Sequence, residues 1–510
     1  MLASIHSASK LSAWIEGITS VDPEAPELEF EGQWRTWGEL TRAAAGLNAL
    51  FDGEAIGPGT RIGVLLRNRA PMVPLLLALF HADRCLASIN ASAPDDKLGE
   101  DIRRAAAPVL IALTSDWARP GVKEAGRAIG AIGIELPEDG DAARRLYDLP
   151  GDRRLWTNVA ADGVAIEMLS SGTTGTPKRI PLTTRKFEHA LLGAAAFEKG
   201  RGEGSEYRLR SGVQIVTAPL AHIAGITGVM NNLLAGRKVC LIEKFSVEGF
   251  RDAVVRHRPK VAGAPPSALR MLLDANLPKE DLSSLVAYRT GTAPLDPALA
   301  DAFYQRYGIP VLQNYGATEF AGGVAGWTLD DFNAHWTGKR GSVGRINKGI
   351  EARIVSTEGH EPLALGETGL LELRGGNIGK DEGWTRTNDL ASLDADNFLW
   401  IKGRHDGAII RGGFKVLPDD VVNALEAHPA VREAAVTGLP DDRLGQVPVA
   451  AYVLKSGHEA PSDEDLKVFL KSKLMPYQVP VRTICLAEFP RTPSMKVSQP
   501  ALREIFEKLD

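Results

Sequence analysis

The segment Ser170–Lys178, with the sequence SSGTTGTPK, carries the residue types that bind an anion. An apolar run at Val164–Leu169 precedes it and predicts a strand, and a helical pattern follows it. Glycines let backbone N–H groups converge on an anion, hydroxyl groups add donors, and Lys178 adds a positive charge. In a kinase-type P-loop the lysine directly follows a glycine, whereas Gly175 and Lys178 are separated here. The segment therefore predicts a phosphate site of another type, with a polar surface turn as the alternative. Its candidate residues are Ser170, Ser171, Gly172, Thr173, Thr174, Gly175, Thr176 and Lys178.

Three later segments each contain one charged side chain suited to nucleotide chemistry. Glu319 lies in QNYGATE, Asp389 in WTRTND and Lys496 in PRTPSMK. A carboxylate is a ligand that Mg²⁺ prefers, and a lysine can offset negative charge that develops at a phosphoryl centre. Taken singly, each of these side chains would be an ordinary solvated charge. Their significance depends on the four segments occurring together.

These segments, in this order, resemble the signature motifs of the adenylate-forming superfamily, which includes acyl-CoA synthetases, nonribosomal-peptide adenylation domains and luciferases. The resemblance covers nearly the whole chain and is closest in type to an acyl- or aryl-CoA ligase. It implies that the Ser170–Lys178 loop holds the β- and γ-phosphates of ATP. It also implies that Tyr315 stacks on adenine, that Thr318 contacts the α-phosphate and that Glu319 holds Mg²⁺. Lys496 would enter the site during adenylation.

The same resemblance assigns the remaining positions around the nucleotide and the thiol acceptor. Asp389 and Arg404 would bind the ribose, and Asp406 would be the hinge between two domains. His222, in PLAHIAG, would lie between the acyl pocket and the channel of the incoming thiol. The segment RGGFK, through Gly412 and Gly413, would line the CoA channel. The adenine side would be formed by Gly291, Thr292, Ala293, Asn314 and Gly316.

The resemblance places the acyl pocket along the segment HIAGITGVM and along the segment AGG at residues 321–323. These residues are small or apolar apart from His222 and Thr227, and no aspartate occurs where an adenylation domain would hold an amino group. An α-amino acid is therefore disfavoured, and a neutral, apolar aryl or aliphatic acid is predicted. The pocket residues are His222, Ile223, Gly225, Ile226, Val229, Ala321 and Gly322.

Four features depart from the family pattern. Asn388 replaces the glycine before the ribose aspartate, Met495 replaces the glycine before the lysine, and Gln499 replaces a frequent arginine. The segment between Gly376 and Trp384 is unusually short. These departures place the packing of the C-terminal domain in doubt, and adenylation is therefore better supported than thioester formation.

The predicted activity is that of an ATP-dependent carboxylic acid–CoA ligase that uses ATP, Mg²⁺ and CoA. The carboxylate and Mg-ATP would give acyl-AMP and pyrophosphate, and CoA would then give acyl-CoA and AMP. One alternative is an adenylating enzyme that passes the acyl group to an amine or a carrier protein. Another is a nucleotide-binding regulator without activity, which the combination of Lys178, Glu319, Asp389, Arg404 and Lys496 disfavours.

The elements that must position these residues predict an α/β fold. Short β-branched runs such as Arg61–Leu66 alternate with helical patterns, which is typical of parallel α/β layers. Closely spaced strands between Ile350 and Trp400 predict a small β subdomain. We predict an N-terminal domain over residues 1–403 and a mobile α+β domain over 404–510. The apolar stretch Ala70–Ala82 is shorter than the about 18 residues of a membrane span and predicts a buried helix.

Composition excludes some classes of partner. The net charge is -5, so no basic excess exists for nucleic-acid phosphates. Cys85, Cys240 and Cys485 are far apart, show no metal-ligand spacing and are predicted to be core residues. The first residues show no signal-peptide pattern. We expect a cytoplasmic protein without stable membrane insertion, and a homodimer is left open.

Overall fold

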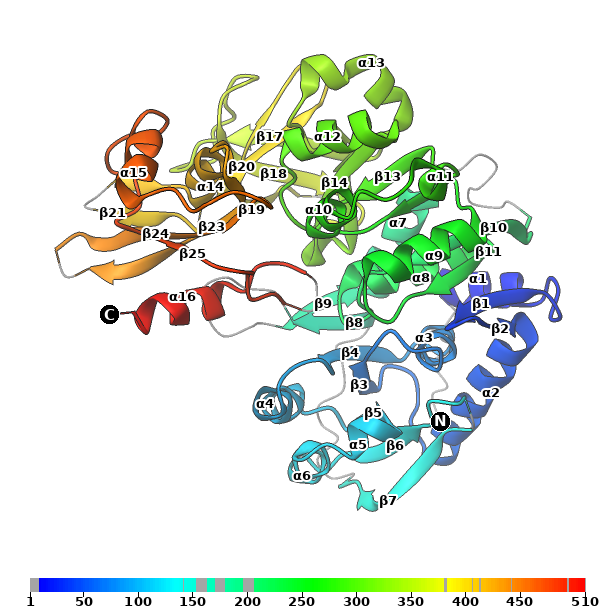
Figure 1. Ribbon diagram of the computed structural model, residues 1–510. Helices are drawn as coiled ribbons and strands as arrows, with labels where there is room; N and C mark the ends of the chain where they lie inside the picture. The colour runs from blue at the N-terminus through cyan, green and yellow to red at the C-terminus, as the bar shows by residue number, and fades with distance from the viewer. Residues whose placement is uncertain are drawn as a thin grey trace.

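The computed structural model of the chain describes residues 9–140, 142–152, 163–169, 179–195, 206–379, 383–405, 407–411, 414–441, 443–492 and 495–509. It confirms the predicted fold class, since several mixed α/β sheets form a large N-terminal domain and a small C-terminal domain follows (Figure 1). None of the described helices is long and apolar enough to cross a membrane.

A seven-stranded sheet in the order β7-β6-β5-β3-β4-β8-β9 forms the lower lobe in Figure 1. The neighbours β6, β5, β3, β4 and β8 run parallel, whereas β7 and β9 are antiparallel edge strands. Fully buried strands such as β3 explain why these segments read as continuous apolar runs. The strands are β3 Arg61–Leu66, β4 Cys85–Asn90, β5 Val109–Leu113, β6 Ile132–Leu136, β7 Arg144–Pro150, β8 Val164–Leu169 and β9 Arg179–Thr183.

The apolar stretch predicted as a buried helix is α3, Met72–His81, and its residues from Met72 to Phe80 are buried. It contacts α1 (Lys10–Thr19), α2 (Trp37–Gly53) and β4, and its side chains belong to the largest core. A helix that is apolar on all sides is stable only in such surroundings. The prediction of a buried helix is confirmed.

Two further sheets make up the middle of the N-terminal domain. One has the order β10-β11-β1-β2 and the other β12-β13-β14-β15-β16. Helices α8 and α9 contact the first of these sheets, and α10 and α12 pack together beside the second (Figure 1). The strands are β1 Pro26–Phe30, β2 Gln33–Thr36, β10 Arg210–Val216, β11 Arg237–Leu241, β12 Val261–Gly263, β13 Ala287–Thr290, β14 Val311–Ala317, β15 Gly322–Gly326 and β16 Arg345–Ile346; the helices are α7 Thr184–Ala195, α8 Ile223–Leu234, α9 Val247–His257, α10 Pro266–Asp274 and α12 Pro297–Tyr307.

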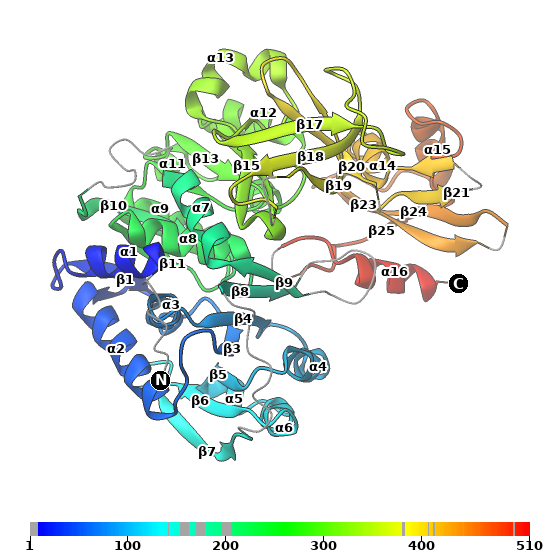
Figure 2. The same cartoon turned by 180° about the vertical axis from the view of Figure 1, so that it is seen from behind.

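The predicted β subdomain is the antiparallel sheet β17-β18-β19-β20, and the C-terminal sheet has the order β22-β21-β24-β23, with β25 beside β24. Both views show the C-terminal domain next to β19 and β20 (Figures 1 and 2), and α14 contacts β20. The strands are β17 Ile350–Val355, β18 Gly369–Gly375, β19 Thr385–Leu393, β20 Leu399–Arg404, β21 Ile409–Arg411, β22 Phe414–Val416, β23 Val431–Asp441, β24 Gly445–Leu454 and β25 Arg482–Cys485; the helices are α14 Pro418–Glu426, α15 Asp463–Lys471 and α16 Gln499–Glu507.

Two details differ from expectation. Strand β9 was not predicted, because its sequence RIPLT contains a proline, which edge strands tolerate. Cys85 and Cys240 are buried as predicted, but Cys485 is exposed at the end of β25, so the core prediction is wrong for this residue.

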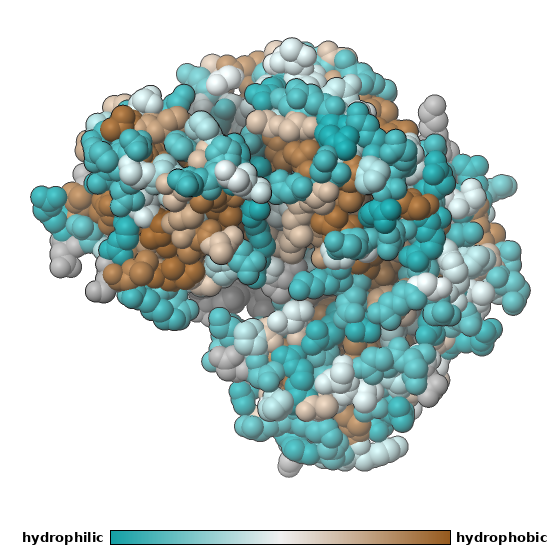
Figure 3. Space-filling view, in the orientation of Figure 1, coloured by the Kyte–Doolittle hydropathy of each residue, from teal (hydrophilic) through white to brown (hydrophobic). Residues whose placement is uncertain are grey.

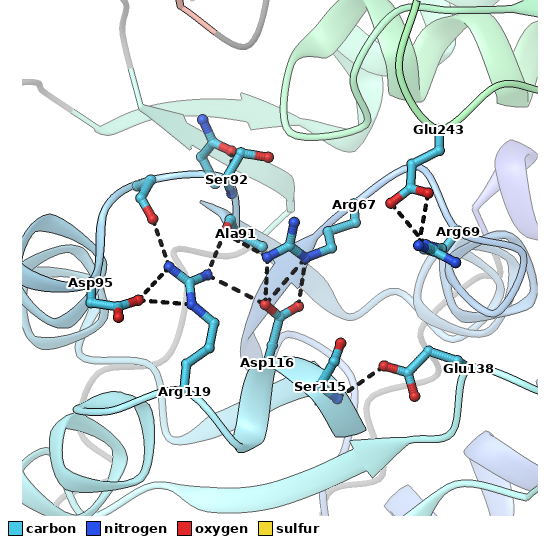
Figure 4. A network of polar contacts seen from close by, with 12 residues as sticks. Arg67, Arg69, Ala91, Ser92, Asp95, Ser115, Asp116, Arg119, Glu138 and Glu243 are labelled. Atoms are coloured by element: carbon cyan, nitrogen blue, oxygen red, sulfur yellow. Dashed lines mark hydrogen bonds and ion pairs between the residues drawn. The ribbon is translucent and has the colours of Figure 1, made fainter. Parts of the chain in front are cut away.

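An ion network ties together the loops that leave the carboxyl ends of β3, β4 and β5. Figure 4 shows Asp116 between Arg67 and Arg119. Arg67 Nη2 lies 2.7 Å from Asp116 Oδ1 and Arg67 Nε lies 2.9 Å from Oδ2, and the Asp116 side chain has no exposed surface. Both arginines also donate to the carbonyl of Ala91, which follows β4. One buried carboxylate therefore fixes three loops.

Asp116→Asn should lower the free energy of unfolding by about 3 kcal/mol, because removing one partner of a buried ion pair leaves the others uncompensated. Urea unfolding followed by circular dichroism measures this change. Glu351→Gln is the control, since Glu351 and Arg374 form an exposed pair, and its loss should be clearly smaller. Equal losses in both variants would contradict a structural role for Asp116.

Candidate active site

The motif segments from different sheets meet where β14 faces β19. The Tyr315 hydroxyl on β14 donates a short hydrogen bond to the Asp389 carboxylate on β19. Asp389 and Arg404 lie directly opposite each other in the β19–β20 pair. The structure therefore brings together three side chains that are far apart in sequence and were predicted to share a nucleotide site.

Hydrogen bonds hold the Asp389 carboxylate in a fixed position. The Asp389 N–H donates to Thr387 Oγ1 at 3.1 Å, and the Thr387 hydroxyl donates to the Leu371 carbonyl at 2.9 Å. Burial, reinforced by the Asp389 charge, raises the pKa of Tyr315, which therefore stays a neutral phenol that donates. An oriented carboxylate beside an aromatic ring can accept hydrogen bonds from a diol such as ribose.

Close backbone approaches explain the glycines beside Tyr315. A Cβ atom at Gly291 would lie 1.9 Å from Asn314 Oδ1, and one at Gly316 would lie 2.2 Å from the Gly322 carbonyl oxygen. Thr292 has a left-handed backbone with φ of 70°, next to the half-buried Ala293. Asn314 and Gly316 are exposed. These positions form an open, side-chain-poor surface where a flat group could lie against Tyr315.

A 3₁₀ turn, Thr318–Phe320, presents the candidate metal ligand. The Glu319 side chain is exposed, and no residue that the structure describes pairs with its carboxylate. Asn377 holds the turn from behind, because its side-chain amide donates to the Phe320 carbonyl at 2.9 Å in a buried position. Glu319 is thus an exposed carboxylate on a turn that is held in place, and a hydrated Mg²⁺ could reach it.

The predicted phosphate loop, residues 170–178, lies outside the described residues. Its flanks are described, since Leu169 of β8 pairs with Arg179 of β9, and β9 contacts the turn that carries Thr318 and Glu319. The predicted hinge Asp406 and the channel residues Gly412 and Gly413 also lie outside the described part.

Lys496 reaches this site from the C-terminal domain. It is half-buried, and burial together with the nearby Arg404 charge lowers its pKa. The Lys496 N–H donates to Thr492 Oγ1 at 3.2 Å, and the Thr492 N–H donates to the Lys496 carbonyl at 2.8 Å, so a tight turn presents the lysine. Within the described residues, no carboxylate forms an ion pair with Lys496. Its ammonium is therefore available to an anionic ligand.

Helix α10 supports the turn that carries Lys496. The Ser267 hydroxyl donates to the Met495 carbonyl at 3.2 Å, and Arg432 lies 3.7 Å from Asp274. These contacts join the two domains in a conformation that holds the lysine inside the site.

His222 lies at the N-cap of α8 with a buried Nε2 atom that has no hydrogen-bond partner among the described residues. Burial lowers its pKa to about 4, and the Lys496 charge adds to this effect. The imidazole is therefore neutral near pH 7. A neutral ring next to Lys496 is placed at the junction between the nucleotide site and α8.

The residues predicted to line the acyl pocket divide into two groups. Ile226, Val229 and Ala321 have no exposed surface and pack into the main core, so their side chains stand behind the site. Gly225 is buried, and a Cβ atom there would lie 2.2 Å from the Pro219 carbonyl oxygen, so only glycine fits. Ile223 and Gly322 keep accessible surface.

The accessible face of α8 also includes residues of the predicted segment HIAGITGVM that were not among the named pocket residues. Ala224, Thr227 and Gly228 are partly exposed, on the side of α8 opposite Ile226 and Val229. The spacing of these residues in the sequence could have indicated this face, because helix positions three and four apart lie on the same side. A Cβ atom at Gly322 would lie 3.7 Å from the Cβ of Ala190 on α7, so small residues leave room here.

The departures from the family pattern are accommodated locally. Asn388 lies within β19, and Met495 takes a left-handed backbone with φ of 65°, which costs about 1 kcal/mol for a residue other than glycine. Gln499 begins α16. Ile378 is buried, and Trp384 lies between the guanidinium groups of Arg353 and Arg374 at 4.4 and 4.8 Å from its ring. The short segment between Gly376 and Trp384 is thus held at its start by the buried Ile378 and at its end by Trp384.

Comparison with known proteins identifies the same architecture. The AMP-binding enzyme family model matches residues 18–381, and the model of the AMP-binding enzyme C-terminal domain matches residues 421–496. The chain is 28% identical over 507 residues to a 2-succinylbenzoate–CoA ligase of Bacillus velezensis, covering 96% of this chain and 97% of the relative. It is 29% identical over 512 residues to a feruloyl-CoA synthase of an Amycolatopsis species, covering 97% and 99%. The fold matches ATP-bound MatB from Rhodopseudomonas palustris with a TM-score of 0.83 at 23% identity, covering 98% and 99%.

The buried imidazole predicts a pH-dependent stability. The pKa of His222 falls from 6.5 to about 4 on folding, so the unfolded chain takes up this proton first as the pH falls below 6.5. Between about pH 7 and about pH 5, the wild type should lose about 2 kcal/mol of unfolding free energy relative to His222→Gln. Urea unfolding of both proteins across this range measures the difference. His458→Gln, at an exposed histidine, is the control, and parallel curves for wild type and His222→Gln would contradict the buried neutral ring.

Proposed function

This chain belongs to the AMP-binding enzyme family of adenylate-forming enzymes, and we propose that it joins a small, apolar carboxylic acid to CoA with ATP as the driving substrate. It is an AMP-forming ligase of the acyl-CoA synthetase type. The observation that carries the proposal is Lys496, a lysine of the C-terminal domain that is half-buried beside Arg404 and His222. A non-catalytic nucleotide binder has no need for such a lysine.

In the first step, a carboxylate oxygen of the acid attacks the α-phosphorus of ATP. The bond to the β-phosphate breaks, so acyl-AMP forms and pyrophosphate leaves. Lys496 would bridge the carboxylate and the α-phosphate and offset the charge that builds up between them. Thr318, at the start of the exposed turn, would donate to the same phosphate. Tyr315, Asp389 and Arg404 would fix the nucleoside beside the glycine-bounded surface.

The phosphates require a cation, and Glu319 is the residue of this chain that would hold Mg²⁺. Glu319 fits this role because its carboxylate is exposed on a turn that is held in place, and because Mg²⁺ binds oxygen ligands and keeps several waters. A bound Mg²⁺ supplies charge neutralisation of the phosphate oxygens. The loop 170–178 would contribute backbone N–H groups, hydroxyls and Lys178 to the β- and γ-phosphates.

In the second step, the thiol of CoA attacks the acyl carbonyl of acyl-AMP. The bond to the phosphate breaks, AMP leaves, and the thiol proton is released. We propose that residues 404–510 rotate about Asp406 between the steps. This motion would withdraw Lys496 and bring Gly412 and Gly413 to the channel, so that one site serves two reactions in turn. Neutral His222 would separate the acyl pocket from that channel.

The acid is proposed to be a neutral aryl or aliphatic molecule. The accessible face of α8, from Ile223 to Gly228, contains no charged residue, and Gly322 and Ala190 are small. A second carboxylate on the substrate would need a cation that α8 and β15 do not supply. Ferulate is such a mono-acid, whereas 2-succinylbenzoate carries a second carboxylate, so the two named relatives define the comparison to test.

Lys496→Ala should reduce ATP–pyrophosphate exchange with a turned-over acid by at least about 100-fold, because the charge that it offsets arises only during adenylation. The same variant should still convert supplied acyl-AMP and CoA to acyl-CoA, since the proposed rotation removes Lys496 from that step. Lys508→Ala, at an exposed lysine, is the control and should leave both rates unchanged. Equal loss of both half-reactions in Lys496→Ala would overturn the two-state assignment.

The overall function is tested by pyrophosphate exchange across a panel of acids, followed by product analysis with CoA, amines and a carrier protein. We expect exchange with apolar mono-acids, at least about tenfold weaker exchange with 2-succinylbenzoate, and an acyl-CoA product. Amide or carrier-bound products without acyl-CoA would favour the alternative acceptor. Nucleotide binding without exchange for any acid would instead indicate a regulator.

A further inference from the structure

Three side chains with metal-ligating atoms meet on a sheet face that contains none of the motif residues. They are Glu29 on β1, Cys240 on β11 and His257, the last residue of α9. Strands β1 and β11 are parallel neighbours, and Glu29 lies directly opposite Cys240, so the two side chains emerge on the same face. One ligand atom from each residue lies within 4.8 Å of the others. We call this group the Glu29 cluster.

The Glu29 cluster is enclosed by protein. The side chains of Glu29 and His257 are 2% and 6% exposed, and Cys240 is 3% exposed. His257 Nε2 lies 2.9 Å from Glu29 Oε2, while Glu29 Oε1 accepts the Gly32 N–H at 2.7 Å. The Trp34 ring packs edge-on against His257 at 5.8 Å. The ligand atoms are thus oriented by neighbours and shielded from solvent.

We propose that the Glu29 cluster is a zinc site in which Cys240 Sγ, His257 Nε2 and a Glu29 carboxylate oxygen are the protein ligands. This combination of sulfur, imidazole nitrogen and carboxylate oxygen is one that Zn²⁺ binds, whereas Mg²⁺ and Ca²⁺ prefer oxygen alone. The carboxyl end of α9, where His257 lies, carries a partial negative charge that favours a cation. The fourth position of the zinc would take a water molecule.

The guanidinium of Arg256 competes with the metal for Glu29. Its Nη2 atom lies 3.3 Å from Glu29 Oε1, and its Nε atom donates to His257 Nε2 at 3.2 Å. Without a metal, Arg256 therefore balances the carboxylate charge, and a metal would have to displace it from both ligands. The Arg256 side chain is 52% exposed and can turn to solvent when a cation enters. As the S–Zn bond forms, the thiol proton leaves to solvent, and the thiolate and carboxylate then balance the metal charge. The metal would fasten α9 to the β1–β11 pair.

Cobalt(II) tests this proposal, because thiolate-bound cobalt absorbs in the near ultraviolet and Mg²⁺-type oxygen sites do not produce this band. The metal-depleted full-length protein is titrated with Co²⁺ in the absence of nucleotide. We expect about one equivalent to bind with the thiolate band, and Zn²⁺ to abolish the band by displacement. Cys240→Ser and His257→Gln should each lose the band.

Cys85→Ser and Cys485→Ser are the matched controls, since one removes a buried and the other an exposed thiol outside the cluster, and both should keep the band. Circular dichroism checks that each variant folds, and His257→Gln, which retains Cys240, decides the result if Cys240→Ser does not fold. The proposal is overturned if the wild type shows no band, which would leave only an ion pair network of Glu29, His257 and Arg256. Persistence of the band in a folded Cys240→Ser or in His257→Gln, or its loss in Cys485→Ser, would also overturn it.

Discussion

The proposed chemistry depends on a half-buried lysine that has no carboxylate paired with it among the described residues. Lys496 lies half-buried near Arg404, and both burial and that charge act against its protonated form. An ammonium in such surroundings gains more from an approaching anion than a solvated lysine would. The carboxylate of the acid and the phosphates of ATP are the anions that this position suits. The neutral state of His222 follows from the same charge and the same burial.

The surrounding backbone is arranged so that these charges can be approached closely. Gly291, Gly316 and Gly225 each stand where a Cβ atom would collide with backbone or side-chain atoms. At these three positions the chain therefore packs closely against itself, and only glycine fits. The charged groups come from strands and from one tight turn, whose positions are fixed by hydrogen bonds. Rigid strands bearing few functional side chains are well suited to a site that must bind tightly at defined points.

The sequence predicted elements well where burial leaves a local pattern in the chain. It could not predict features that depend on residues which are neighbours only in the folded structure. The apolar run of β3 and the apolar helix α3 could be predicted because burial on all sides leaves a continuous signal. Cys485 could not be placed, since an exposed and a buried cysteine look alike in sequence. The Glu29 cluster could not be predicted from the sequence, because its ligands come from three separate elements, β1, β11 and α9. Cys240 therefore appeared to lack any metal-ligand spacing, although a strand register sets it opposite Glu29.

The contacts between the domains bear on how one site can serve two reactions. Helix α10 meets the Lys496 turn through a hydroxyl-to-carbonyl hydrogen bond, and its Asp274 forms a long ion pair with Arg432 on β23. Interactions of this kind contribute only about 1 kcal/mol each, so they hold a conformation without locking it. The left-handed backbone of Met495 lowers that stability further, because it adds strain to the same turn. The proposed rotation of residues 404–510 would have to break these polar contacts and also the packing of Leu417 against Leu370 and Leu390. The first proposed step would change the anions at this site, because pyrophosphate leaves and the acid carboxylate becomes part of the mixed anhydride of acyl-AMP, so that fewer negative charges face Lys496.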